Sequence, residues 1–166
     1  MKKKTLILIL SLAVAYFAMA QDCPNHSWTV GIEGGYSIKH SPIAGFNFGC
    51  NFSTYNIHAG MIAHISTLTN NGMLTYIKIG HTFNIGETFY LTASAGYAYS
   101  FKSADKEGIN RNMLLFSPEI GYKFTFSNYA GEFPMAVYLS GTQTYAPVDK
   151  SFKDYKIVVI GLRGYF

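Results

Sequence analysis

Residues 89–101 read FYLTASAGYAYSF, and two kinds of side chain alternate along them. Every odd-numbered position is apolar or aromatic, from Phe89 to Phe101, whereas most even-numbered positions carry serine, threonine, glycine or alanine. Successive side chains of a β-strand point to opposite faces. An alternation of period two therefore predicts a strand whose two faces meet different surroundings.

The same alternation recurs on both sides of this segment. The eight alternating segments are 28–38, 44–52, 55–65, 73–83, 89–101, 114–126, 135–142 and 157–166. The connections are alternately short (53–54, 84–87, 127–133) and longer (66–72, 102–111, 145–154), with 39–42 the shortest of the second set. An even number of strands with short turns on one side and longer loops on the other is typical of outer-membrane barrels. The sequence predicts an all-β, eight-stranded antiparallel up-and-down barrel.

The distribution of charge predicts which face of the barrel is outside. The charges within the segments all lie on the face with small and polar side chains: Glu33, Lys78, Glu119, Lys123 and Arg163. The other face carries most of the large aromatic residues. A narrow lumen accepts small and paired polar side chains, whereas lipid accepts aromatic bulk and penalises a charge by about 2–4 kcal/mol at mid-bilayer. We therefore expect a transmembrane barrel with a polar, packed lumen.

The first 20 residues read MKKKTLILILSLAVAYFAMA and have the pattern of a cleaved signal peptide. Three lysines precede an apolar stretch that ends at Ala18-Met19-Ala20, and a signal anchor is the alternative interpretation. We expect residues 21–27 to form a periplasmic segment and 28–166 to form the barrel domain. Without the leader lysines the formal charge falls from +4 to about +1, so nucleic-acid binding loses its electrostatic support.

The last nine residues, VVIGLRGYF (158–166), alternate in the same way and end in phenylalanine. Here the chain resembles the small outer-membrane barrels typified by the OmpA transmembrane domain and OmpX. The resemblance implies a Gram-negative outer-membrane location and a C-terminal signal for the barrel-assembly machinery, carried by Leu162, Tyr165 and Phe166. Gly164 departs from the family pattern, which has a large apolar residue there. An ordinary edge strand can also end in phenylalanine.

The inward charges predict a polar network. Strands one and eight become neighbours when the barrel closes, so Glu33 is expected to pair with Arg163. Glu119 is expected to pair with Lys123 or Lys78, because an unpaired charge in a lumen with little water is costly. A gated ion path is the functional alternative to structural packing.

Two further pairs of residues raise hypotheses. Cys23 and Cys50 are the only cysteines, and an oxidising periplasm would permit a disulfide between them. His64 and Ser66 faintly resemble the His-x-Ser of outer-membrane lipid A deacylases, but the next acidic residue, Glu87, belongs to the opposite rim. No metal-ligand spacing is present, and we expect no cofactor.

The sequence predicts a non-enzymatic outer-membrane protein with an envelope role or a surface interaction made by its loops. A narrow channel and a lipid A hydrolase are the alternatives. The expected partners are outer-membrane lipid, lipopolysaccharide, the assembly machinery and an unidentified surface partner, with no nucleic acid. The mixed-charge stretches 102–107 and 149–154 are the candidate contact surfaces.

Overall fold

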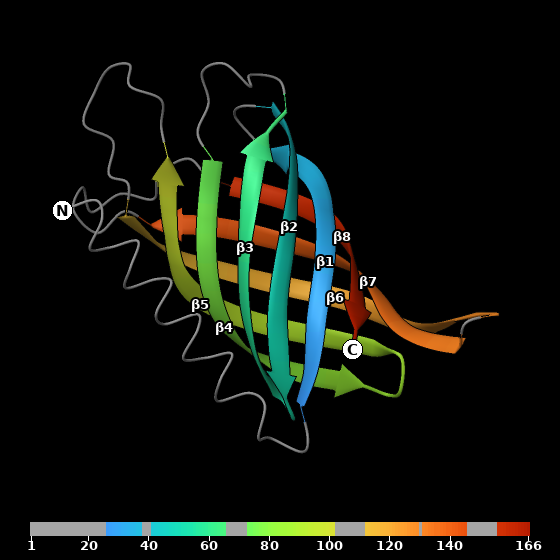
Figure 1. Ribbon diagram of the computed structural model, residues 1–166. Coiled ribbons are helices and arrows are strands. Elements are labelled where there is room, and N and C mark those ends of the chain that lie inside the picture. Colours follow the sequence, from blue (N-terminus) through green and yellow to red (C-terminus); the bar gives the residue numbers. More distant parts are fainter. Residues whose placement is uncertain (1–25, 38–40, 66–72, 102–111, 130, 146–155) are drawn as a thin grey trace.

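The computed structural model describes residues 26–37, 41–65, 73–101, 112–129, 131–145 and 156–166. They form eight strands: β1 (His26–Ser37), β2 (Ser41–Phe52), β3 (Tyr55–His64), β4 (Met73–Ile85), β5 (Phe89–Phe101), β6 (Asn112–Asn128), β7 (Gly131–Tyr145) and β8 (Lys156–Tyr165). Each strand pairs antiparallel with the next, and β8 pairs with β1 to close the barrel (Figure 1). The predicted architecture is confirmed. β1 includes His26 and Ser27, which the sequence had assigned to the preceding segment. Within the described ranges, no helix has the length and apolar character needed to cross a membrane.

The burial pattern along the strands is that of a barrel with an apolar outer wall. On β8, Val158 and Ile160 face outward and are exposed, whereas Ile157, Val159 and Arg163 face inward and are buried. Four of the five predicted inward charges, Glu33, Lys78, Glu119 and Arg163, are almost fully covered, whereas Lys123 is half-buried. The alternation in the sequence therefore predicted both faces of the wall correctly.

The lumen is polar at its centre and apolar toward one end. We call the end of the barrel that carries the Ser53–Thr54 turn the turn end, and the opposite end, where β3 and β5 finish, the loop end. An apolar layer fills the lumen near the loop end: Ile43, Ile62, Leu74, Ala98, Met113, Leu115, Ile157 and Val159. The sequence predicted a polar lumen throughout, and this layer is the difference. Inward apolar residues at strand ends do not interrupt the period-two pattern, so they were not distinguished.

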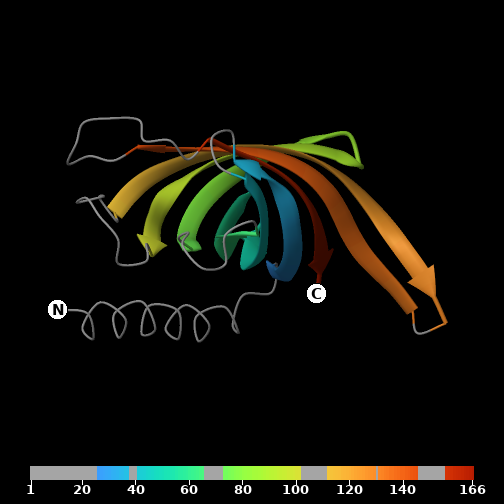
Figure 2. The same ribbon diagram turned by 90° about the horizontal axis from the view of Figure 1, so that it is seen from above.

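The hairpin between β6 and β7 differs from the prediction. The sequence assigned residues 127–133 to a connection, but β6 continues to Asn128 and β7 begins at Gly131, with Phe126 paired to Phe133. Pairing of β6 with β5 ends at Tyr122, and pairing of β7 with β8 ends at Met135. The tip of this hairpin therefore projects beyond its neighbours (Figure 2). Its serine, asparagine, glycine and proline residues are typical of turns, which explains the wrong prediction.

Candidate functional site

Three inward-facing tyrosines occupy the centre of the lumen. Each lies opposite a glycine on a neighbouring strand, and a Cβ atom at that glycine would overlap the tyrosine ring. The pairs are Tyr76 with Gly60, Tyr90 with Gly121, and Tyr138 with Gly161. These glycines therefore create the space that lets three bulky rings fit inside eight strands. In the sequence these glycines are recognisable only as small lumen residues, because the strand register that places each one opposite a tyrosine is not visible there.

The Glu33 carboxylate on β1 accepts hydrogen bonds from three other strands. The Tyr76 hydroxyl donates to Oε1 at 3.0 Å, and the Tyr138 hydroxyl donates to Oε2 at 3.0 Å. Asn47 Nδ2 lies 3.2 Å from Oε2 and 2.8 Å from the Tyr138 hydroxyl. Glu33 is thus held by neutral donors, and not by the Arg163 guanidinium that the sequence predicted.

Arg163 on β8 forms a bidentate ion pair with Glu119 on β6. Its Nη1 lies 2.7 Å from Oε1 and its Nη2 lies 3.1 Å from Oε2. The register partners of Arg163 are Gly31 on β1 and Ala136 on β7, and its guanidinium reaches Glu119 two strands away on β6. The predicted Glu33–Arg163 pair is therefore wrong, because adjacency of two strands does not fix where a long side chain ends.

Further contacts complete the environment of this ion pair. The Tyr90 hydroxyl donates to Glu119 Oε1 at 2.9 Å, and the Arg163 guanidinium carbon lies 4.3 Å from the centre of the Tyr138 ring. Lys78 Nζ lies 3.9 Å from Glu119 Oε2 and donates to Ser117 Oγ at 3.3 Å. Of the two cations suggested for Glu119, the structure places Lys78 beside it.

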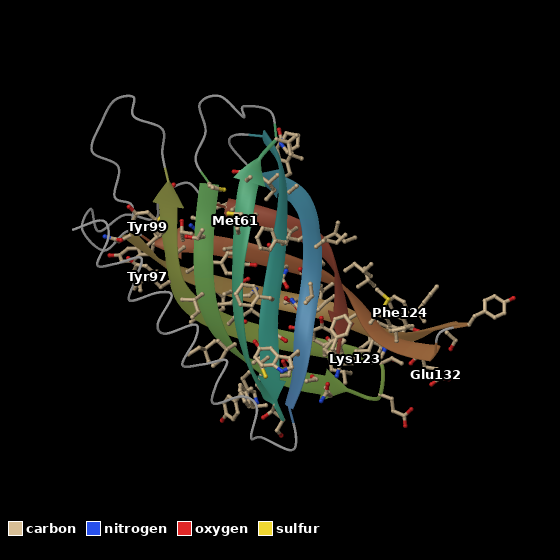
Figure 3. The ribbon with its side chains drawn as sticks, viewed as in Figure 1. Met61, Tyr97, Tyr99, Lys123, Phe124 and Glu132 are labelled. Atoms are coloured by element: carbon tan, nitrogen blue, oxygen red, sulfur yellow. The ribbon has the colours of Figure 1, made fainter. Side chains whose placement is uncertain are left out.

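Lys123 lies apart from this network. Its Nζ donates to Asn84 Oδ1 at 2.9 Å and sits 5.5 Å from the centre of the Tyr90 ring. Figure 3 shows it near the turn end of β6, next to Phe124. Lys123 is therefore a residue of the barrel mouth, and not of the central network to which the sequence had assigned it.

The pairing of each tyrosine with a glycine predicts that a larger residue at the glycine destabilises the protein. Replacing Gly161 by alanine should lower the free energy of unfolding by about 1–3 kcal/mol, because the methyl group displaces the Tyr138 ring and its hydrogen bond to Glu33. Urea titration of protein folded into lipid vesicles measures this change. Gly141→Ala is the matched control, since nothing lies within 4 Å of a Cβ atom there. Equal stability of the two variants would contradict the proposed role of Gly161.

A cavity of about 680 Å³ opens at the turn end of the lumen. Arg163, Tyr90 and His58 line it from inside the barrel, and Lys123 and Asn84 lie near its mouth. Toward the loop end, a second void of about 10 Å³ borders Glu33 and Tyr76, which is room for roughly one water molecule. The lumen thus combines an open polar cavity with a tightly packed centre.

The remaining predicted site residues are placed as follows. Cys50 lies on β2 and is fully buried, whereas Cys23 is outside the described residues, so their disulfide stays a prediction. His64 ends β3, and Ser66 is also outside the described residues, as are the stretches 102–107 and 149–154.

The C-terminal residues complete the seam of the barrel. Leu162 faces outward, Tyr165 packs against the buried cluster, and Phe166 is exposed. The backbones of Phe166 and Trp28 exchange hydrogen bonds of 2.8 and 3.0 Å. The last residue is therefore part of the closure between β8 and β1.

Comparison with known proteins identifies the architecture. No family model and no curated protein matches the chain. Among solved structures, the N-terminal β-barrel domain of Pseudomonas aeruginosa OprF matches with a TM-score of 0.57 over 86% of this chain and 98% of that domain. The chain shares the fold of the OprF barrel domain. The two sequences are 16% identical, so the likeness extends to the fold alone. The predicted resemblance to a small outer-membrane barrel is confirmed at that level.

The solution structure of the de novo designed TMB2.3 matches with a TM-score of 0.49, at 13% identity, over 88% of this chain and 96% of the design.

Proposed function

We propose that the protein is an integral outer-membrane barrel with a sealed lumen, which is not an enzyme and serves the envelope as a structural element or through its outer loops. The observation that carries the proposal is the inverted polarity of the wall. Ile32 and Ile160 face outward with exposed fractions of 66% and 60%, whereas Arg163 is 3% exposed. Exposed apolar surface on this scale is unfavourable in water and favourable in lipid.

The two ends of the sequence support export and assembly. The leader 1–20 has the pattern of a secretory signal. The terminal strand, with Leu162, Tyr165 and Phe166, fits recognition by the barrel-assembly machinery. In this orientation the short turns face the periplasm and the longer connections face outward, where they would contact lipopolysaccharide and any surface partner.

The packing of the central side chains supports a sealed lumen. The Arg163–Glu119 pair and the tyrosine rings occupy the middle, and the apolar layer lies beyond them toward the loop end. Eight strands leave an interior just wide enough for side chains. We therefore expect the purified protein to give no discrete conductance steps in planar lipid bilayers.

A narrow channel is the second candidate, and one contact favours it. Lys78 lies 3.9 Å from Glu119, so Glu119 has a second cation available if Arg163 moves away. Single-channel steps in the unmodified protein that change in Glu33→Ala or Arg163→Ala would favour the channel over the sealed barrel.

Unchanged lipid A acylation in a His64→Ala strain would argue against the lipid A hydrolase.

The physiological role calls for a genetic experiment. Deleting the gene and measuring envelope permeability, surface adhesion and lipid A composition in one strain distinguishes the three classes. A permeability defect that the Arg163→Ala protein fails to complement would support the structural role. An adhesion defect alone would support the loops as the functional surface.

A further inference from the structure

We propose that the cavity at the turn end is a binding site for a small, uncharged, hydroxyl-rich molecule with the size and chemistry of a mono- or disaccharide. The volume of about 680 Å³ falls within the range of roughly 300–1,000 Å³ typical of small-molecule sites. The inference goes beyond the proposed envelope role, because it assigns a ligand to a surface that this role does not use.

The lining of the cavity has the composition expected for such a ligand. Its polar side chains include many hydroxyls and amides, among them Ser27, Asn51, Asn56, Thr82, Thr92 and Thr125. Aromatic side chains, including Tyr90, Tyr122 and Tyr165, share the lining. Sugar hydroxyls exchange hydrogen bonds with amides and hydroxyls, and the C–H faces of the sugar ring pack on aromatic rings.

The charges around the cavity are balanced, which favours a neutral ligand. Arg163 is neutralised by its bidentate pair with Glu119. Lys123 and Glu87 both line the cavity near its mouth and carry opposite charges. An anion such as phosphate would meet no excess of positive charge here, and a polyamine would meet no excess of negative charge.

Two buried atoms of lining residues point to the hydroxyl group in particular. Among the described residues, Asn56 Oδ1 and Arg163 Nε have no hydrogen-bond partner, and both atoms are covered by neighbouring side chains, so a ligand reaches them once those side chains shift. One atom is an acceptor that needs a donor, and the other is a donor that needs an acceptor. A hydroxyl group serves both needs, whereas a carboxylate only accepts and an ammonium group only donates. Asn56 is held in place by its Nδ2, which donates to Thr82 at 2.8 Å.

Nuclear magnetic resonance titration of the refolded protein tests the proposal. The detergent must have a zwitterionic headgroup without sugar, so that it does not occupy the site. Diacetylchitobiose is the probe, with inorganic phosphate and spermidine as charged counterparts. We expect chitobiose to shift the backbone amides of Asn56, Thr92 and Arg163 in a saturable manner, and phosphate and spermidine to leave them unchanged. A longer chitin oligomer that binds equally well would indicate that the mouth admits a glycan chain end, and selective binding of the disaccharide would indicate a free solute.

Two variants separate binding from folding. Asn56→Leu removes the amide at nearly constant volume and should weaken chitobiose binding about tenfold, the equivalent of one hydrogen bond. Asn112→Leu, at the loop end of β6 and outside the cavity lining, is the control and should bind normally. Thr125→Trp changes an exposed residue at the mouth and should obstruct entry while the barrel stays folded. The proposal is overturned if chitobiose causes no saturable shifts, if phosphate or spermidine causes the same shifts, or if Thr125→Trp binds as the unmodified protein does.

Discussion

Replacing Arg163 by methionine is expected to lower the free energy of unfolding by about 3–5 kcal/mol, the usual cost of breaking a buried ion pair from one side. The substitution removes both charged hydrogen bonds to Glu119 while the carboxylate stays buried. Among the described side chains, Glu119 would then keep two polar contacts. The Tyr90 hydroxyl lies 2.9 Å from Oε1, and Lys78 Nζ lies 3.9 Å from Oε2. Urea titration in lipid vesicles, with gel mobility as the readout of folding, measures the loss.

A double variant identifies the source of this cost. Arg163→Met combined with Glu119→Gln should recover part of the lost stability, because the central charges are again equal in number, Glu33 against Lys78, although Lys78 loses its neighbouring carboxylate. Lys123→Met is the surface control. Its Nζ donates a hydrogen bond to Asn84 at the partly exposed mouth of the barrel, so a change below about 1 kcal/mol is expected. If Arg163→Met were as stable as Lys123→Met, the ion pair would not hold the centre of the lumen.

The sequence predicts the fold well because the side-chain period of a strand is a local property. Alternation in 89–101 and 157–166 is enough to identify which residues of β5 and β8 face the lumen. The apolar outer face then predicts that the sheet closes. Such a face is favourable only against lipid, and a sheet in lipid cannot leave unpaired edges. Neither inference requires knowledge of which residues meet across the barrel.

Which side chains pair inside the lumen cannot be predicted from the sequence of one strand at a time. Whether Arg163 reaches Glu33 or Glu119 depends on the stagger between strands and on the volume beside each side chain. Gly31 and Ala136 are the register partners of Arg163, and the Asn47 amide fills the space beside Gly31. Four of the five predicted charges therefore lie in the central network, whereas Lys123 lies at the mouth and Arg163 pairs with Glu119 in place of Glu33.

The cavity and the β6–β7 hairpin were missed for a related reason. A cavity is bounded by residues from many strands, so the sequence of any single segment does not predict it. The hairpin continues as paired strands through Ser127 and Glu132 because hydrogen bonding between its two strands suffices without neighbours. Residue types common in turns indicated a loop there, and only the register of the two strands shows otherwise.

The outward apolar wall leads to the second large effect. Ile160 lies at the middle of β8, between Leu139 on β7 and Gly34 on β1, and its side chain is 60% exposed. Arginine at this position should lower the free energy of unfolding in lipid vesicles by about 2–4 kcal/mol, since a guanidinium group near the bilayer centre loses its hydration. The cost should shrink in vesicles of shorter-chain lipid, where the charge reaches the headgroups more easily.

A matched substitution separates position from chemistry. Glu132→Arg introduces the same side chain on the exposed tip of the β6–β7 hairpin, beyond the last residues of β7 that pair with β8. It should change stability by less than about 0.5 kcal/mol, as most surface substitutions do. A soluble barrel would behave in the opposite way, because an outward arginine in place of an exposed isoleucine would improve its solubility. An Ile160→Arg protein that folds as well as the unmodified chain, or dissolves without detergent, would show that the wall does not face hydrocarbon.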